Sequence, residues 1–301
     1  MRKIKAILAG AVLVLSGLAV ASQPATAGAP VYRAAKGMPS KSAPLTSKSG
    51  VNTFFYAAAD QTPTAATDTV YMNGLVANPT LSGANHSLGE VAVHLNGTNP
   101  GGFGQTVELG WTVDPGVCGS GATPCLFGFW WKNGVPQCYN AGCGWVPYAP
   151  STYTLGQSIS GAVGSLKQFA IQHTGNAWWL SYDNVWMGYY PDSLWTGTTM
   201  GGAGATPAVT FQNIGYYQVF GEVAYNGATT QPASTACGDM GNGALGSSTS
   251  PLPARWSAVN MLQSGTTVPA TLTSMGNANP TYWYGYAITA QTWRYGGPGA
   301  C

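Results

Sequence analysis

Short stretches in which apolar and polar side chains alternate predict that this chain is built from β-strands. In residues 107–113, VELGWTV, the large apolar side chains fall on one face of a strand, while Glu108 and Gly110 fall on the other. Residues 217–225, YQVFGEVAY, repeat this arrangement and place Phe220 and Glu222 on one face. Each glutamate is therefore expected to project from the middle of a strand, away from the apolar side.

Other candidate strands have similar lengths and are separated by turn sequences such as NGTNPGG and KNGVP. They are residues 90–96, 106–114, 125–131, 168–174, 177–184 and 282–295. The segment SLKQFAI, residues 165–171, has room for one turn of helix. Two antiparallel sheets stacked face to face would bury such strands, which predicts an all-β sandwich. A barrel of about eight to ten strands is the alternative.

The N-terminus has the features of a secretory signal peptide. Three basic residues precede an apolar run over residues 6–21, and small residues follow it. We expect residues 1–27 to be cleaved off, residues 28–50 to form a flexible leader or short propeptide, and residues 51–301 to form one β domain. The mature protein is then expected to be secreted and extracellular, with no membrane segment.

Charge is sparse in the expected domain. From Val51 onward the basic residues are Lys132, Lys167, Arg255 and Arg294. A basic surface for nucleic acid is therefore not expected. Acid unfolds proteins largely by protonating carboxylates that are ion-paired in the folded state, and few such pairs can form here. The composition predicts a fold that tolerates acid.

All six cysteines lie in the exported part, and an even number outside the cell favours disulfides. Their short spacing favours the pairs Cys118 with Cys125 and Cys138 with Cys143, and Cys237 with Cys301 would then form the third pair. No CxxC or Cys/His cluster suggests a metal site, so neither a metal nor another cofactor is expected.

Carboxylates are the remaining candidates for chemistry, because serine-nucleophile, zinc-protease and nucleotide-binding motifs are missing. The three histidines are scattered and are interpreted as surface or structural residues. Glu108 and Glu222 are the two mid-strand glutamates, whereas Glu90 starts its candidate strand and is interpreted as a solvated structural residue. Two carboxyl groups in one cleft can divide acid and base work, in either peptide or glycoside hydrolysis.

Five segments, in order, resemble the neprosin family of secreted glutamic peptidases, which act in acid and cut after proline. They are VELGWTVDP (107–115), FGFWWKNG (127–134), QCYNAGC (137–143), AWWLSYDNVWMGYYPDSLW (177–195) and FGEV (220–223). The resemblance implies a sandwich of two antiparallel sheets with a concave active-site cleft. It also implies that Glu108 and Glu222 form the catalytic pair and that Cys138 pairs with Cys143.

Two departures from the family pattern qualify what the resemblance implies. Only the short leader precedes Val51, where the plant members carry a long activation domain, so zymogen control of the plant type is not expected. Phe220 stands where the plant members have glycine, so the substrate preference is expected to differ. Phe220, Trp186 and Tyr190 are the candidate substrate-binding residues, since aromatic rings can stack on a proline ring.

The sequence thus predicts a monomeric, metal-independent endopeptidase that binds a peptide or protein substrate. Two alternatives stay open at this point. A carbohydrate-active enzyme would use the same carboxylates with aromatic platforms for sugar rings. A carbohydrate- or wall-binding module would need the aromatic residues but not the glutamates.

Overall fold

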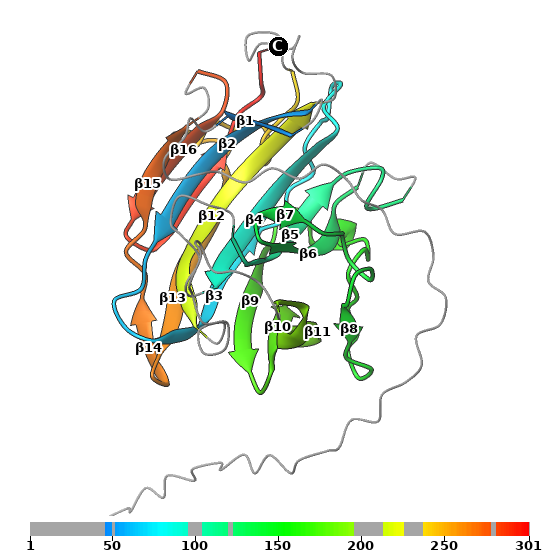
Figure 1. Ribbon diagram of the computed structural model, residues 1–301. Helices are drawn as coiled ribbons and strands as arrows, with labels where there is room; N and C mark the ends of the chain where they lie inside the picture. The colour runs from blue at the N-terminus through cyan, green and yellow to red at the C-terminus, as the bar shows by residue number, and fades with distance from the viewer. Residues whose placement is uncertain are drawn as a thin grey trace, which may run out of the picture. The chain divides into compact units, whose positions relative to one another are not determined.

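A computed structural model describes residues 46–49, 52–95, 104–119, 123–195, 213–225, 237–277 and 281–300. All of them belong to one unit, Val31–Cys301, and the other unit, Met1–Pro30, lies outside the described residues. The described part is all-β, with two antiparallel sheets that Figure 1 shows as two layers. This confirms the predicted sandwich rather than the barrel.

The first sheet, called sheet A below, has the strand order β1-β2-β12-β4-β5-β6-β7, with β15 also paired to β2. Its strands are β1 (Thr46–Ser49), β2 (Asn52–Gln61), β4 (His86–Leu95), β5 (Thr106–Val113), β6 (Cys125–Lys132), β7 (Val135–Pro136), β12 (Ile214–Tyr225) and β15 (Thr273–Asn277). Strands β4, β5 and β12 are adjacent at the centre, although β12 comes more than a hundred residues after β5 in the chain.

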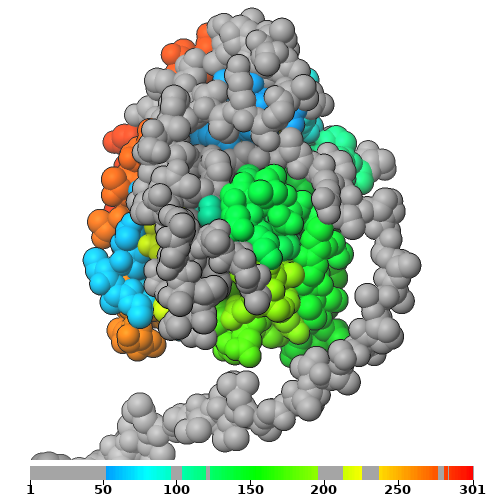
Figure 2. All heavy atoms as spheres, viewed as in Figure 1, coloured from blue at the N-terminus to red at the C-terminus, as the bar shows by residue number. Residues whose placement is uncertain are grey.

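The second sheet, sheet B, has the order β16-β17-β13-β3-β9-β10-β11-β8, with β14 paired to β13. Its strands are β3 (Thr67–Leu75), β8 (Val146–Pro147), β9 (Leu166–Thr174), β10 (Ala177–Tyr182), β11 (Val185–Pro191), β13 (Ala254–Gln263), β14 (Thr266–Pro269), β16 (Tyr284–Thr289) and β17 (Thr292–Gly296). Two short 3-10 helices, Ser160–Ala162 and Asp192–Trp195, flank β9 to β11. In Figure 2 the residues of the middle of the chain, in green, occupy one side of the visible face and C-terminal strands, in orange, the other.

The core lies between the sheets and follows the predicted alternation. Val107, Leu109 and Trp111 of β5 are fully buried there, together with Val219 and Val223 of β12. Large aromatic side chains from sheet B complete the core: Trp178, Tyr190, Trp256, Trp293 and Tyr295. Alternation then turns Glu108 and Glu222 to the outer face of sheet A, the face that points away from this core.

The strand predictions differ from the structure at several places. Strand β4 begins at His86 rather than at Glu90, and residues 282–295 form the hairpin β16–β17 rather than one strand. The segment 165–171 lies largely in β9 and contains no helix. Strand β1 lies within residues 28–50, the expected flexible leader, and it pairs with β2 of the expected domain. The expected segments also did not include β2, β3, β7, β8, β11, β13, β14 and β15.

Two predicted disulfides are confirmed. Cys118 pairs with Cys125 and Cys138 with Cys143, with Cα–Cα distances of 5.5 and 6.0 Å. The third predicted pair includes Cys301, which lies outside the described residues. Within the described ranges, no helix has the length and apolar character needed to cross a membrane.

Candidate active site

All three glutamates of the chain lie on the outer face of sheet A. Glu108 is on β5, Glu90 on β4 and Glu222 on β12, which are neighbouring strands. None of the three side chains is exposed to solvent. The interpretation of Glu90 as a solvated residue at a strand start is therefore wrong, because the strand begins four residues earlier and Glu90 lies at its centre.

The strand register places the three glutamates in a diagonal row, called the carboxyl row below. Glu90 lies directly opposite Gly110 on β5 and Phe220 on β12. Glu108 and Glu222 are each two residues from these positions, in opposite directions along the sheet. Diagonal neighbours in an antiparallel sheet have Cα atoms about 7–8 Å apart, so Glu90 is close to both other glutamates. The Cα atoms of Glu108 and Glu222 are about twice as far apart, with Glu90 midway between them.

Gly110 is required for this arrangement. A Cβ atom at Gly110 would lie 2.1 Å from the carbonyl oxygen of Gly89 and 2.8 Å from the ring of Phe127. Any larger residue would therefore push β4 and β5 apart at the point where Glu90 sits. The glycine beside Glu108 in the sequence thus keeps the middle of the carboxyl row closely packed.

At the Glu108 end of the row, the described hydrogen-bond partner is an indole ring. The indole Nε1–H of Trp131 donates a hydrogen bond to Oε1 of Glu108. Ala92 lies opposite Glu108 on β4, and Gln218 lies opposite Ala92 on β12. The small side chain of Ala92 thus separates two polar side chains, those of Glu108 and Gln218, at one level of the sheet.

The Glu222 end of the row carries a positive charge. Nε2 of His86 lies 2.5 Å from Oε1 of Glu222, and Nδ1 lies 3.5 Å from Oδ2 of Asp114. Burial lowers the pKa of His86, but hydrogen bonds to Asp114 and Glu222 and the attraction of both carboxylates outweigh it and raise the pKa from 6.5 to about 9. The ring is therefore an imidazolium at neutral and acidic pH. In the described part of the chain, no group of His, Cys, Asp or Glu is arranged to hold a metal ion.

The three candidate substrate-binding residues are not together. Phe220 points to the same side as Glu222, as the alternation predicted, and is buried opposite Glu90. Tyr190 is fully buried in the core between the sheets. Trp186 lies on sheet B, where its ring contacts that of Trp179, and Trp179 alternates with the core residue Trp178. Phe220 therefore adjoins the carboxyl row on the outer face, whereas Tyr190 lies on the core side of the sheet, where burial and the charge of Glu108 raise the pKa of its hydroxyl.

The pairing of His86 with Glu222 was not predicted from the sequence. The sequence carries one relevant signal, because His86, Glu90 and His94 share the parity of the outer face once β4 is extended to residue 86. What the sequence does not show is the loop that brings Asp114 to the same histidine. His94 is also buried on this face, between Gln218 and Thr106.

The architecture and the carboxyl row define an all-β sandwich with acidic groups buried on one sheet face. The sequence profile of the family described as Neprosin matches residues 83–298, which is most of the chain. The chain therefore belongs to the neprosin family and is a peptidase.

Solved structures with a similar chain fold include two peptidases. One is a crystal structure of scytalido-glutamic peptidase with a peptide-based transition state analog, with a TM-score of 0.45, 11% identity, and coverage of 81% of this chain and 98% of that chain. Another is SCP-B of the eqolisin family with the tripeptide Ala-Ile-His, with a TM-score of 0.44, 10% identity and coverage of 81% and 98%. A family 16 endo-glucanase from Bacteroides ovatus has a TM-score of 0.33, 11% identity and coverage of 62% and 73%.

Proposed function

We propose that the chain is a secreted glutamic endopeptidase that acts in acid, with Glu108 and Glu222 as catalytic groups and Glu90 between them. The supporting observation is that every glutamate of the chain is buried in one diagonal row on one sheet face. Carboxyl groups that share a buried face cannot all ionise readily, which favours a mixture of one neutral acid and one ionised base.

The reaction needs both forms. An ionised carboxylate of the row removes a proton from water, and the resulting hydroxide attacks the scissile carbonyl carbon. A neutral carboxyl group of the row donates its proton to the carbonyl oxygen. When the tetrahedral intermediate collapses, the C–N bond breaks, the amine leaves with the proton taken from water, and the carbonyl oxygen returns its proton to the row. Glu90 lies diagonal to both ends and is placed to pass a proton between them.

Substrate selection would involve Phe220, which borders the row where plant members have no side chain. The family resemblance implies cleavage after proline, but the plant members lack the Phe220 ring, so we expect the preference at the cut site to differ from theirs, with ring stacking on Phe220 as one contact that would alter it. Because the row is fully buried, binding of a peptide must be coupled to opening of this face. We expect the mature enzyme to be a monomer that needs no cofactor.

The test is to incubate the mature protein with a proline-rich peptide library between about pH 3 and pH 7 and to identify the cut sites by mass spectrometry. The proposal predicts cleavage that is strongest in acid and is lost in a Glu108→Gln, Glu222→Gln double variant. Asp60→Asn is the matched control, because Asp60 is a buried carboxyl group on the same sheet but outside the row. Cleavage that persists unchanged in the double variant would refute the proposal.

A carbohydrate-binding role has one feature in its favour. Tyr148, Trp179, Trp186 and Tyr189 form a partly exposed aromatic group on sheet B. Aromatic rings of this kind can stack on sugar rings. Retention of a polysaccharide by the double glutamate variant, with no peptide cleavage by the wild type, would favour this second function.

A further inference from the structure

His86 bridges two carboxylates, one from β12 and one from the loop that follows β5. It is the first residue of β4, it is only 3% exposed, and its two ring nitrogens face Glu222 and Asp114. Because both nitrogens face a carboxylate oxygen, the arrangement suits a ring that carries a proton on each nitrogen. The ring of Phe54 from β2 lies 6.2 Å away, between ring centroids, and is not titratable. Glu222 and Asp114 are the titratable groups that act on His86.

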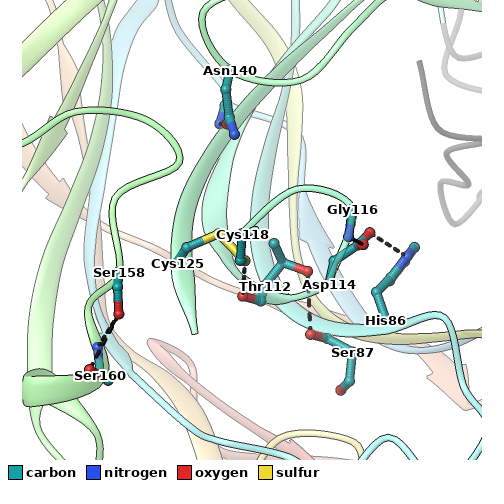
Figure 3. The surroundings of a disulfide bond; sticks show 11 residues. His86, Ser87, Thr112, Asp114, Gly116, Cys118, Cys125, Asn140, Ser158 and Ser160 are labelled. Carbon is teal, nitrogen blue, oxygen red and sulfur yellow. Dashed lines mark hydrogen bonds and ion pairs between the residues drawn. A yellow bond between two sulfur atoms is a disulfide. The ribbon is translucent and has the colours of Figure 1, made fainter. Parts of the chain in front are cut away.

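Asp114 is held by the loop that follows β5. The amide N–H of Gly116 donates to Oδ1 of Asp114 over 2.8 Å, and the amide N–H of Cys118 donates to the Asp114 carbonyl oxygen over 2.8 Å. The disulfide from Cys118 to Cys125 then joins this loop to the start of β6. Figure 3 shows the Asp114 carboxylate between the Gly116 amide and the His86 ring, next to the disulfide. One oxygen of Asp114 is thus fixed by the loop, and the other is left to contact His86.

The two oxygens of Glu222 are not equivalent. Oε1 contacts His86, while Oε2 is buried and has no hydrogen-bond partner among the described residues. A buried carboxylate oxygen without a partner is costly unless another group binds to it. Water or substrate can supply that group, and the contact with His86 fixes which oxygen is available.

We propose that His86 and Asp114 are positioning residues that orient Glu222 as the general base, with Oε2 as the atom that takes the proton from water. This inference rests on the proposed peptidase function and deepens it, since it assigns the base within the carboxyl row. The Cys118–Cys125 disulfide contributes to this positioning, because it holds the loop that carries Asp114. In catalytic triads a reacting group is likewise held by a partner that a third group keeps in place.

The first experiment compares His86→Gln and Asp114→Asn with His94→Gln, which alters the other buried histidine of β4. Peptide cleavage is measured as kcat and KM over a range of pH, and folding is checked by thermal unfolding. Both positioning variants should lower kcat by about 10²–10⁴-fold with KM little changed, and should reshape the acid limb of the pH profile. An unchanged kcat in a folded His86→Gln variant would overturn the proposal.

A second measurement does not depend on catalysis. The protonation of the His86 ring is followed by NMR of its nitrogens in the wild type and in Asp114→Asn. In the wild type, the ring should keep both protons at pH values well above the ordinary pKa of histidine. In Asp114→Asn, it should lose one of them at a lower pH than in the wild type. A wild-type ring that titrates as an ordinary histidine would overturn the proposal. A doubly protonated ring in a protein that cleaves no peptide would instead refute the peptidase function and leave the pairing established.

The part of the Asp114 loop can be tested by removing each of the two local disulfides in turn, because only Cys118–Cys125 holds that loop. A Cys118→Ser, Cys125→Ser variant should lose kcat and lower the pH at which His86 loses a proton. A Cys138→Ser, Cys143→Ser variant removes a disulfide of similar span and should lose thermal stability without a change in the His86 titration. Equal effects of both variants on the His86 titration would contradict a specific part for the first disulfide.

Discussion

The two ends of β4 carry buried histidines on the same sheet face, yet the two rings have opposite surroundings. His86 lies between two carboxylates, whereas His94 lies 3.0 Å from Oε1 of Gln218 and 3.1 Å from Oγ1 of Thr106. A neutral ring that carries its proton on Nε2 satisfies both contacts of His94. The ring of His94 is also stacked on that of Tyr216 at a centroid distance of 3.8 Å.

This comparison separates burial from charge. Both histidines are nearly or fully buried, with exposures of 3% and 0%. Since burial alone favours the neutral form, the carboxylates are what make His86 an imidazolium. Glu222 therefore has a charged partner, whereas the described hydrogen-bond partner of Glu108 is the neutral indole of Trp131. Variants along the row test whether this difference determines which group is the base.

The largest effect is expected from the ends of the row. Glu222→Gln removes the proposed base and should lower kcat/KM for peptide cleavage by about 10²–10⁴-fold or more, and Glu108→Gln should have an effect of the same order. Initial rates with a peptide found in the library screen measure this. Asp60→Asn should stay close to wild type. Full activity in either glutamine variant would remove that residue from the catalytic assignment.

A smaller effect is expected from the centre of the row. Glu90→Gln keeps the shape of the side chain but cannot exchange protons, so it should lower kcat by about 10²-fold if Glu90 links the two ends. The pH range over which kcat is high should also narrow. The proton that the three carboxyl groups share can then occupy only two of them. If Glu90→Gln changes only thermal stability, Glu90 is a structural residue and the two ends act without it.

His86 should also make stability depend on pH. Its folded pKa of about 9 exceeds the ordinary value of 6.5, so its stabilisation is complete below about pH 6.5 and is lost as the pH rises through about 9. The difference corresponds to a free energy of unfolding of up to about 3 kcal/mol. Urea unfolding at pH 6 and pH 9.5 should show this loss in the wild type and in His94→Gln, but not in His86→Gln. A wild type that is equally stable at both pH values would contradict the ion pairing.

The parts of the fold that could be predicted from sequence are those controlled by alternation. The faces of β5 and β12 follow directly from the spacing of Val107, Leu109 and Trp111 and of Val219 and Val223. Strand β2 was missed because its sequence, NTFFYAAADQ, is apolar or small on both faces, and both of its faces are buried. A strand buried on both sides gives no alternating pattern.

The parts of the site that could not be predicted depend on register. No local pattern shows that β12 inserts between β2 and β4, and this placement is what aligns Glu222 beside Glu90. The pairing of His86 with Asp114 likewise needs the β4–β5 register and the turn after β5. The family resemblance implied Glu108 and Glu222 as the catalytic pair without any knowledge of the register, and it carried no implication for Glu90 or His86.

The smallest effect is expected on the outer face of sheet B, and it separates two of the residues predicted to bind substrate. Trp186→Ala should leave kcat/KM for peptides unchanged, because Trp186 belongs to the aromatic group of sheet B rather than to the row. Phe220→Leu, next to Glu90, should instead change KM by about tenfold and shift the preferred residue at the cut site. Cleavage-site profiles of the two variants measure both effects. If Trp186→Ala shifts the profile and Phe220→Leu does not, peptides bind on the sheet B side, and the carboxyl row is not where the substrate lies.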